Sequence, residues 1–434
     1  MGSNLLGQKA PHSHTDSLFN KLEQTDLIDF LVYSFKLGDH GKVDRTSQPG
    51  DVHFSVIPVA PASSGDGKVA ISAINASFYL DPHSNISSIY FYPYTNFNGS
   101  YGVTLTPNIW LDKNQWNGVG DFRFIHNGSP EYGLGANTSI NNPVNIQYEQ
   151  ARTYFTLQTR VVRYFYIGGG YNLDLFYSVK EIVNSEQLPS DFSTYPYGTG
   201  SNTTSSGVTF NLLRDNRRNS INPTNGFYTA AIFRINNKSM GSTYDWGSLY
   251  LDGRKYISLS KKRHKVFAFR GMYWGAYGDV PYFNLSSTFQ DISGRAGRGY
   301  SNNRFRGKQM IFGEAEYRFD ISHHGFWGGV VFVNAQTFTE PTSEKFNYVR
   351  PAAGVGLRMK FNRNSDTNLT LDFAYGKDGF NFYINLGEYF SEVGYGSGHA
   401  VRRTPDSFGE RSRSIDRGIE ESSFIDSIFI SHSV

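Results

Sequence analysis

Short runs of alternating hydrophobic and polar residues dominate the chain from about residue 53 to residue 390. The clearest runs lie at 103–111, 309–321, 354–361, 368–375 and 380–390, and turn-forming residues separate them. Alternation with a period of two puts apolar side chains on one face of an extended strand and polar side chains on the other. The pattern therefore predicts many one-sided antiparallel strands and an all-β fold.

The run at 309–321 indicates which way these strands face. One face carries the apolar or small residues Ile311, Gly313, Ala315, Tyr317, Phe319 and Ile321, and the other carries Glu314, Glu316, Arg318 and Asp320. A soluble core strand would turn the apolar face inward, whereas a membrane barrel turns it toward lipid and leaves the charges in a wet lumen. We interpret the run as a barrel strand. A large soluble β-sandwich or propeller is the alternative.

Composition favours the barrel and excludes several other classes of protein. Aromatic residues reach 16%, charged residues only 18%, and the 434 residues include 45 Gly, whereas charged residues make up about 25% of a typical soluble protein. The chain has no Cys, which excludes disulfides, cysteine-ligated metals and thiol nucleophiles. A net charge of +3 gives no indication of a nucleic-acid partner.

The length of the patterned region predicts sixteen strands. Roughly 21 residues per strand and connection give about sixteen, an even number as bacterial barrels require. We expect strands to begin near residues 53, 68, 88, 101, 115, 146, 164, 205, 226, 243, 265, 308, 326, 349, 368 and 380. The tight connections at 112–115, 260–265, 322–325 and 362–366 then fall on the periplasmic side. The long connections at 128–145, 179–203 and 276–307 fall on the other side.

The two ends of the chain differ from this pattern and define three regions. We expect residues 1–52 to form an N-terminal periplasmic segment, in which apolar spacing over 16–37 predicts an amphipathic helix that packs on the periplasmic mouth or enters the lumen. The start at Met1-Gly2-Ser3 is typical of an engineered expression start, so we expect a native export signal to have been replaced. We expect residues 53–390 to form the barrel and the Ser-, Arg- and Gly-rich residues 391–434 to form a mostly disordered tail.

Four motifs, in order along the chain, resemble the BamA/TamA superfamily, also called the bacterial surface antigen family. The turn at 213–228 resembles a periplasmic turn of the family, with Arg214, Asp215, Asn216, Pro223 and Gly226 as its motif residues. The sequence Gly297-Arg298-Gly299-Tyr300 resembles the motif of the family's sixth extracellular loop, and 316–319 resembles the strand after it. Residues 376–390 are similar to its closing strand with a terminal Phe. The resemblance covers about 53–390 and implies an integral barrel of the Gram-negative outer membrane.

The resemblance also implies that the sixth loop folds inward and is latched inside the lumen. Gly297 and Gly299 permit the positive φ and close approach that such a loop needs. Arg298 would then be confined in the lumen and would need carboxylate partners. Glu316 and Asp372 are the candidates, because their positions in the strand alternation place both side chains on the inward face. Where the family usually has an Asp, this chain has Asn334, which supplies no charge. The alternative is that Arg298 is a solvated loop residue.

A second candidate feature is the seam where the first and last strands meet. Pro58 and Pro61 lie in the first strand and cannot donate hydrogen bonds to a β-ladder. Gly379 and Gly387 weaken the last strand, which we expect to end at Phe390. In the family, such a lateral seam lets incoming strands add to an exposed edge. A permanently closed barrel with tolerated edge prolines is the alternative.

These features together predict a barrel that takes part in insertion or translocation of protein, or of lipid, at the outer membrane. The short N-terminal segment leaves no room for the POTRA domains that receive clients in the family, so we expect a branch without them. The sequence contains no GxSxG, P-loop or HExxH motif, and we expect neither enzymatic activity nor a cofactor or metal. The expected partners are outer-membrane lipid and accessory proteins that recognise clients. A passive pore or a surface-exposed binding barrel is the alternative function.

Overall fold

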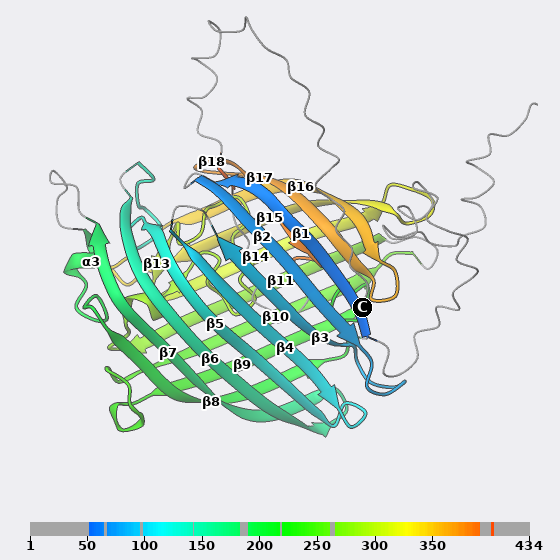
Figure 1. The fold of residues 1–434 in the computed structure, drawn as a ribbon, viewed down its shortest axis with the longest axis horizontal. Helices are drawn as coiled ribbons and strands as arrows, with labels where there is room; N and C mark the ends of the chain where they lie inside the picture. Colours follow the sequence, from blue (N-terminus) through cyan, green and yellow to red (C-terminus); the bar gives the residue numbers. More distant parts are fainter. Residues whose placement is uncertain are drawn as a thin grey trace, which may run out of the picture.

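Sixteen strands form one continuous antiparallel sheet that wraps into a barrel (Figure 1). The computed structural model describes residues 52–64, 67–95, 99–141, 143–182, 190–217, 219–260, 265–390 and 401–402. The strands are β1 (Val52–Ser64), β2 (Gly67–Phe78), β3 (Ser87–Thr95), β4 (Tyr101–Leu111), β5 (Trp116–Glu131), β6 (Val144–Val162), β7 (Phe165–Ile182), β8 (Thr203–Asp215), β9 (Gly226–Asn236), β10 (Trp246–Ser258), β11 (Lys265–Gly278), β14 (Gln309–Asp320), β15 (Trp327–Phe338), β16 (Val349–Asn362), β17 (Thr367–Gly376) and β18 (Gly379–Leu386). The predicted fold class and strand number are confirmed, and each strand begins within about three residues of its predicted start.

Successive strands pair in simple up-and-down order from β1 to β18. Short connections lie at one end of the barrel, which we call the turn end, and long ones lie at the other, which we call the loop end. The loop end carries the short helix α3 (Asp191–Thr194) and lies to the left in Figure 1. The first two long connections are shorter than predicted because β5, β6 and β7 extend further; Glu131, for example, still pairs with Val144.

Side chains alternate between an apolar outer surface and a polar lumen. In β14, Ile311 is 45% exposed on the outside, whereas Glu314, Glu316 and Arg318 are buried in the lumen. Such an inverted distribution, with charges inside and apolar residues outside, is typical of a strand that faces lipid. Among the described residues, no helix is long and apolar enough to cross a membrane.

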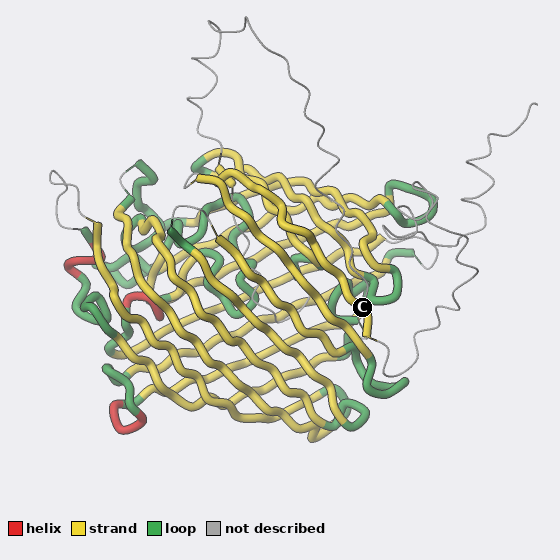
Figure 2. The backbone as a smooth tube through the Cα atoms, in the orientation of Figure 1, coloured by secondary structure: helices red, strands yellow, loops and turns green. Residues whose placement is uncertain are grey.

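The connection between β11 and β14, which we call loop 6 (residues 279–308), folds inward and fills much of the lumen, as Figure 2 shows for the loops inside the sheet. It contains the 3-10 turn η2 (Tyr282–Asn284) and a small hairpin of β12 (Ser286–Ser287) and β13 (Arg306–Gly307). Tyr300 and Phe305 pack with Phe312 and Phe338 of the wall in one buried cluster. The predicted inward fold of the sixth loop is therefore confirmed.

The predicted N-terminal helix at 16–37 and nearly all of the tail at 391–434 lie outside the described residues. Within the described part of the chain, the sheet begins at Val52, and its last long strand ends at Leu386. A two-residue strand, β19 (Val401–Arg402), pairs with β18.

Candidate functional site

Arg298 lies at the centre of a buried ion-pair cluster inside the barrel. Its guanidinium binds Glu314, Glu316 and Asp372, with Nη1 lying 2.7 Å from Asp372 Oδ2. All four side chains are fully buried. The guanidinium also lies over the ring of Phe332, with 3.6 Å between Cζ and the ring centroid. The alternative of a solvated Arg298 does not agree with this geometry.

The backbone on both sides of Arg298 explains why the motif needs glycine. Gly297 and Gly299 have φ values of 120° and 104°, which side-chain-bearing residues rarely adopt. A Cβ on Gly299 would lie 2.4 Å from Ala352 Cβ, so the loop contacts the wall through bare backbone. The Tyr300 hydroxyl donates a hydrogen bond to the Pro351 carbonyl (2.7 Å). We call Gly297, Arg298, Gly299, Tyr300, Glu314, Glu316 and Asp372 the latch.

Polar groups of the wall bind the backbone of the latch. The Asn334 amide donates to the Arg298 carbonyl (2.8 Å), and the Asn381 amide donates to the Gly299 carbonyl (3.0 Å). The Tyr383 hydroxyl accepts from the Gly299 N–H (2.8 Å) and donates to the Tyr300 carbonyl (2.9 Å). Asn334 therefore contributes through its amide, as a neutral side chain can. Asn381 and Tyr383 belong to β18, so the last strand holds loop 6 directly.

The closing strand differs from its prediction. β18 ends at Leu386 instead of continuing to Phe390. Gly387, with a φ of 86°, turns the chain away from the sheet. Residues 387–390, which we call the hook, enter the lumen, where the Phe390 carbonyl accepts hydrogen bonds from Tyr256 and Arg254. Phe390 therefore belongs to the lumen, and the ladder edge of β18 is shorter than expected.

The hook joins the latch through charges that the sequence analysis did not single out. Arg358 lies 2.5 Å from Asp372 Oδ1 and 3.0 Å from Glu388 Oε2. Arg318 binds Glu316 at 2.8 Å. Strand parity alone would place Glu388 on the outer face with Ile384, because the inward residues of β18 are odd-numbered. The turn at Gly387 ends this alternation and directs Glu388 into the lumen. In the sequence, the only indication of this turn is a glycine followed directly by a carboxylate.

Loop 6 has further anchors away from the latch. Arg306 binds Glu131 at 2.9 Å, and Arg304 binds Asp378 at 2.6 Å. Asp291 of loop 6 binds Arg270 at 2.7 Å. Burial alone would raise the pKa of the Asp291 carboxyl, but Arg270 and hydrogen bonds from Ser293 and the Ala296 N–H hold this pKa below its ordinary value. The loop is therefore held by several separate ion pairs.

The seam between the first and last strands has no continuous ladder in the described part of the chain. β1 pairs with β2, β18 pairs with β17 and with β19, and β19 lies against β1. Pro58 falls in a register shift between Ile57 and Ala60, whereas Pro61 stays in register opposite Ala70. Gly379, with a φ of 107°, begins β18 after a two-residue hairpin. The Asn362 amide, at the end of β16, donates to the Phe54 carbonyl of β1 at 3.4 Å, so β1 contacts the sheet near its last strands at the turn end.

The turn motif at 214–226 folds across the turn end. Asp215 accepts hydrogen bonds from the Arg217 side chain at 2.8 and 2.9 Å. Asn216 Oδ1 accepts from the Phe227 N–H at 2.7 Å, and Gly226, with a φ of 105°, leaves room for this bond. Arg214 lies outside on the Phe227 ring, and Pro223 is buried. The turn reaches the hook, because the Glu388 N–H donates to the Ile221 carbonyl at 3.4 Å.

Comparison with known proteins identifies the family. A family model described as the Omp85 superfamily domain matches residues 84–390, while the search of curated proteins gave no match. Among solved structures, BamA from Haemophilus ducreyi lacking POTRA domains 1–3 is similar, with 16% identity, a TM-score of 0.47, and coverage of 86% of this chain and 81% of that chain. CdiB from Acinetobacter baumannii has 11% identity, a TM-score of 0.47, and coverage of 80% of this chain and 58% of that chain. This chain thus spans less than two thirds of the length of CdiB.

The family match includes the latch, the hook and all but the first two strands of the barrel. Omp85 barrels are assembly and transport proteins and are not enzymes. Since the matched residues make up most of the chain and carry the charged lumen and apolar exterior, the chain belongs to the Omp85 superfamily of outer-membrane β-barrels.

Proposed function

We propose that this barrel inserts or translocates protein at the bacterial outer membrane, and that its functional motion is opening of the seam between β1 and β18. The observation that carries the proposal is the break in pairing at this seam. Every other pair of neighbouring strands has a ladder, but none joins β1 to β18 among the residues that the structure describes. Unpaired backbone groups that face lipid cost several kcal/mol each, so an incoming strand would relieve them.

The edge of β18 supports strand addition. The short strand β19 pairs antiparallel with Asn381 and Phe382, so this edge is geometrically open to an extra strand. Pairing of an extended segment with a free edge needs only backbone hydrogen bonds and tolerates many sequences. This tolerance suits a barrel that handles different client proteins.

The contents of the lumen favour assembly over passive conduction. Loop 6 fills much of the lumen and is fixed by the latch, so a wide open pore would require its displacement. We expect outer-membrane lipid to surround the seam and accessory proteins to deliver clients to it. These partners are part of the proposal.

Cysteine cross-linking across the seam tests the proposal, because the native chain contains no Cys. Cysteine pairs are scanned between residues 55–59 of β1 and 382–386 of β18, and the most complete disulfide is chosen. Expressed as the sole copy in the source bacterium, this variant should reduce the abundance of other outer-membrane proteins until a reductant is added. The control is a disulfide between Val331 and Val355, which are directly opposite in the β15–β16 ladder and exposed outside.

The outcome distinguishes the two functions. Loss of activity with the seam lock, together with normal activity of the control lock, supports seam opening. Normal activity of the seam-locked protein would refute the proposal. Steady ion conductance of the seam-locked barrel in a planar bilayer would then favour the passive pore.

A further inference from the structure

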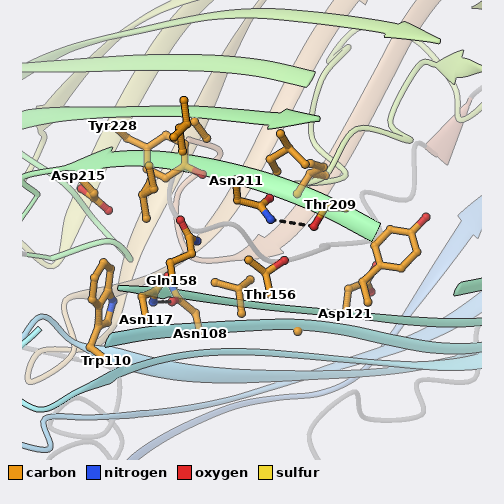
Figure 3. Close-up of a pocket in the computed structure, with 18 of the residues that line it drawn as sticks. Asn108, Trp110, Asn117, Asp121, Thr156, Gln158, Thr209, Asn211, Asp215 and Tyr228 are labelled. Carbon is orange, nitrogen blue, oxygen red and sulfur yellow. Dashed lines mark hydrogen bonds between the residues drawn. The ribbon is translucent and has the colours of Figure 1, made fainter. Parts of the chain in front are cut away.

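An internal chamber lies in the turn-end half of the lumen, against the wall formed by β4 to β9. Figure 3 shows side chains of β4, β5 and β6 on one side of this space and side chains of β8 and β9 on the other. Ile292 of loop 6 also lines it, but no residue of the latch or hook does. The cavity has a volume of about 90 Å³. A single buried water needs roughly 10–15 Å³ of such space, so the chamber has room for several waters or for one small polar ligand.

The polar lining of the chamber is rich in neutral groups. Its neutral polar side chains are the amides of Asn108, Asn117, Gln158, Asn172 and Asn211 and the hydroxyls of Thr156 and Thr209. The charged residues of the lining are already paired: Asp215 binds Arg217 at 2.8 Å, and Asp121 binds Arg123 at 2.9 Å. The chamber therefore offers both donors and acceptors without an unpaired charge among the described residues.

Three buried polar atoms in the lining have no hydrogen-bond partner within the described protein. They are the Gln158 Oε1 acceptor, the Trp110 Nε1 donor and Asp121 Oδ2, on residues that are 6%, 2% and 3% exposed. The charge on Asp121 is compensated by Arg152, 3.5 Å from Oδ2, which leaves the amide acceptor and the indole donor. A buried polar group left without a partner costs about 1–3 kcal/mol, and most such groups in native proteins are satisfied. One acceptor and one donor in the same chamber indicate a ligand or solvent that supplies both functions.

The aromatic residues of the lining narrow the class of ligand. The rings of Trp110, Tyr154 and Tyr228 line the same space as the amides. A sugar ring combines an apolar C–H face, which packs on aromatic rings, with hydroxyls that each donate and accept. An ionic ligand would lack a free counter-charge here, and a purely apolar ligand would leave the amides unpaired. We propose that this chamber binds a neutral saccharide of one ring.

Calorimetry on the complete folded protein tests this assignment. The protein is kept in lauryldimethylamine oxide, because glycoside detergents would compete, and is titrated with glucose and N-acetylglucosamine. Galacturonic acid serves as the charged probe. We expect saturable binding of at least one neutral sugar and at least tenfold weaker binding of galacturonic acid.

Two variants locate the binding. Gln158→Met keeps the side-chain length and removes the amide, and it should weaken binding at least tenfold. Gln150→Met is the control, because Gln150 lies on the same strand and is also buried but does not line the chamber. If Gln158→Met fails to fold, Trp110→Phe removes the N–H donor and carries the test. Absence of saturable binding by any neutral sugar, equal binding of galacturonic acid, or unchanged affinity of the folded chamber variant would overturn the assignment.

Discussion

Arg358 holds Glu388 in the lumen, with 3.0 Å between Nε and Oε2, while the same guanidinium lies 2.5 Å from Asp372. Asp372 also binds Arg298 of loop 6. Loop 6 and the hook that follows β18 are therefore parts of one buried charge network. Because the hook continues directly from the seam strand, displacement of β18 breaks contacts that fix the loop. In the proposed mechanism, opening of the seam would therefore also displace loop 6.

Replacing Arg298 should destabilise the barrel strongly. Arg298→Ala leaves Glu314, Glu316 and Asp372 buried without their shared cation. Loss of one partner from a buried ion pair costs roughly 3–5 kcal/mol, and lumenal water will reduce this value. The measurement is the urea midpoint of the protein in detergent. Lys308→Ala, which breaks a solvent-exposed pair, is the control and should shift the midpoint little. If both variants shifted the urea midpoint equally, the buried ion pairs of Arg298 would contribute no more stability than the exposed pair of Lys308.

Much of this architecture follows from local pattern. The strand starts were predictable because alternation has a period of two and turn residues interrupt it, so neither depends on distant contacts. Glu316 and Asp372 were identified as candidate partners of Arg298 because inward parity follows from position along a strand. Glu314 shares this parity, and the structure adds it as a third carboxylate at Arg298.

The remaining contacts depend on tertiary structure. Arg306 binds Glu131, which lies 175 positions earlier in the chain, and no sequence pattern connects these two residues. The sequence analysis did not predict the hook, because it continued the alternating strand pattern through Gly387 to Phe390. In the structure, the positive φ at Gly387 ends the strand. Parity predicts the face of a side chain only while the strand continues.

Gly299→Ala should prevent loop 6 from seating correctly. The substitution puts a Cβ 2.4 Å from Ala352 Cβ and requires an alanine at a φ of 104°. Unfavourable backbone conformations cost about 1–3 kcal/mol, and the clash adds to this cost. Gly241→Ala is the matched control, since Gly241 has a φ of 91° but no atom within 4 Å of its Cβ position. Protease cleavage within loop 6 should increase for the Gly299 variant only. If cleavage within loop 6 increased equally in both variants, the contact with Ala352 would not be needed to seat the loop.

Stability should depend on pH through Asp291. Its pKa is lower in the folded protein than the ordinary value of 3.8. A carboxyl with a lowered folded pKa contributes stability that is complete above its unfolded pKa and is lost as pH falls toward the folded value. We therefore expect this contribution to be constant near neutral pH and to decrease below about pH 4. Urea midpoints measured from pH 7 to pH 3 should show a smaller acid-side decrease for Asp291→Asn than for the wild type. An identical decrease would exclude Asp291 as a contributor.

Tyr383→Phe should loosen loop 6 from the seam strand. The Tyr383 hydroxyl bonds both the Gly299 N–H and the Tyr300 carbonyl, so its removal leaves two buried backbone groups without this partner. Each such loss costs about 1–3 kcal/mol. Tyr389→Phe is a close control, because Tyr389 is equally buried and its hydroxyl has no hydrogen-bond partner among the described residues. Tyr383→Phe should therefore increase hydrogen exchange at 297–300 and raise the frequency of conductance bursts in a planar bilayer. If the two variants behave alike, β18 does not hold loop 6 through this hydroxyl, and the proposed connection between lumen and seam must depend on Asn381 and the Arg358 network.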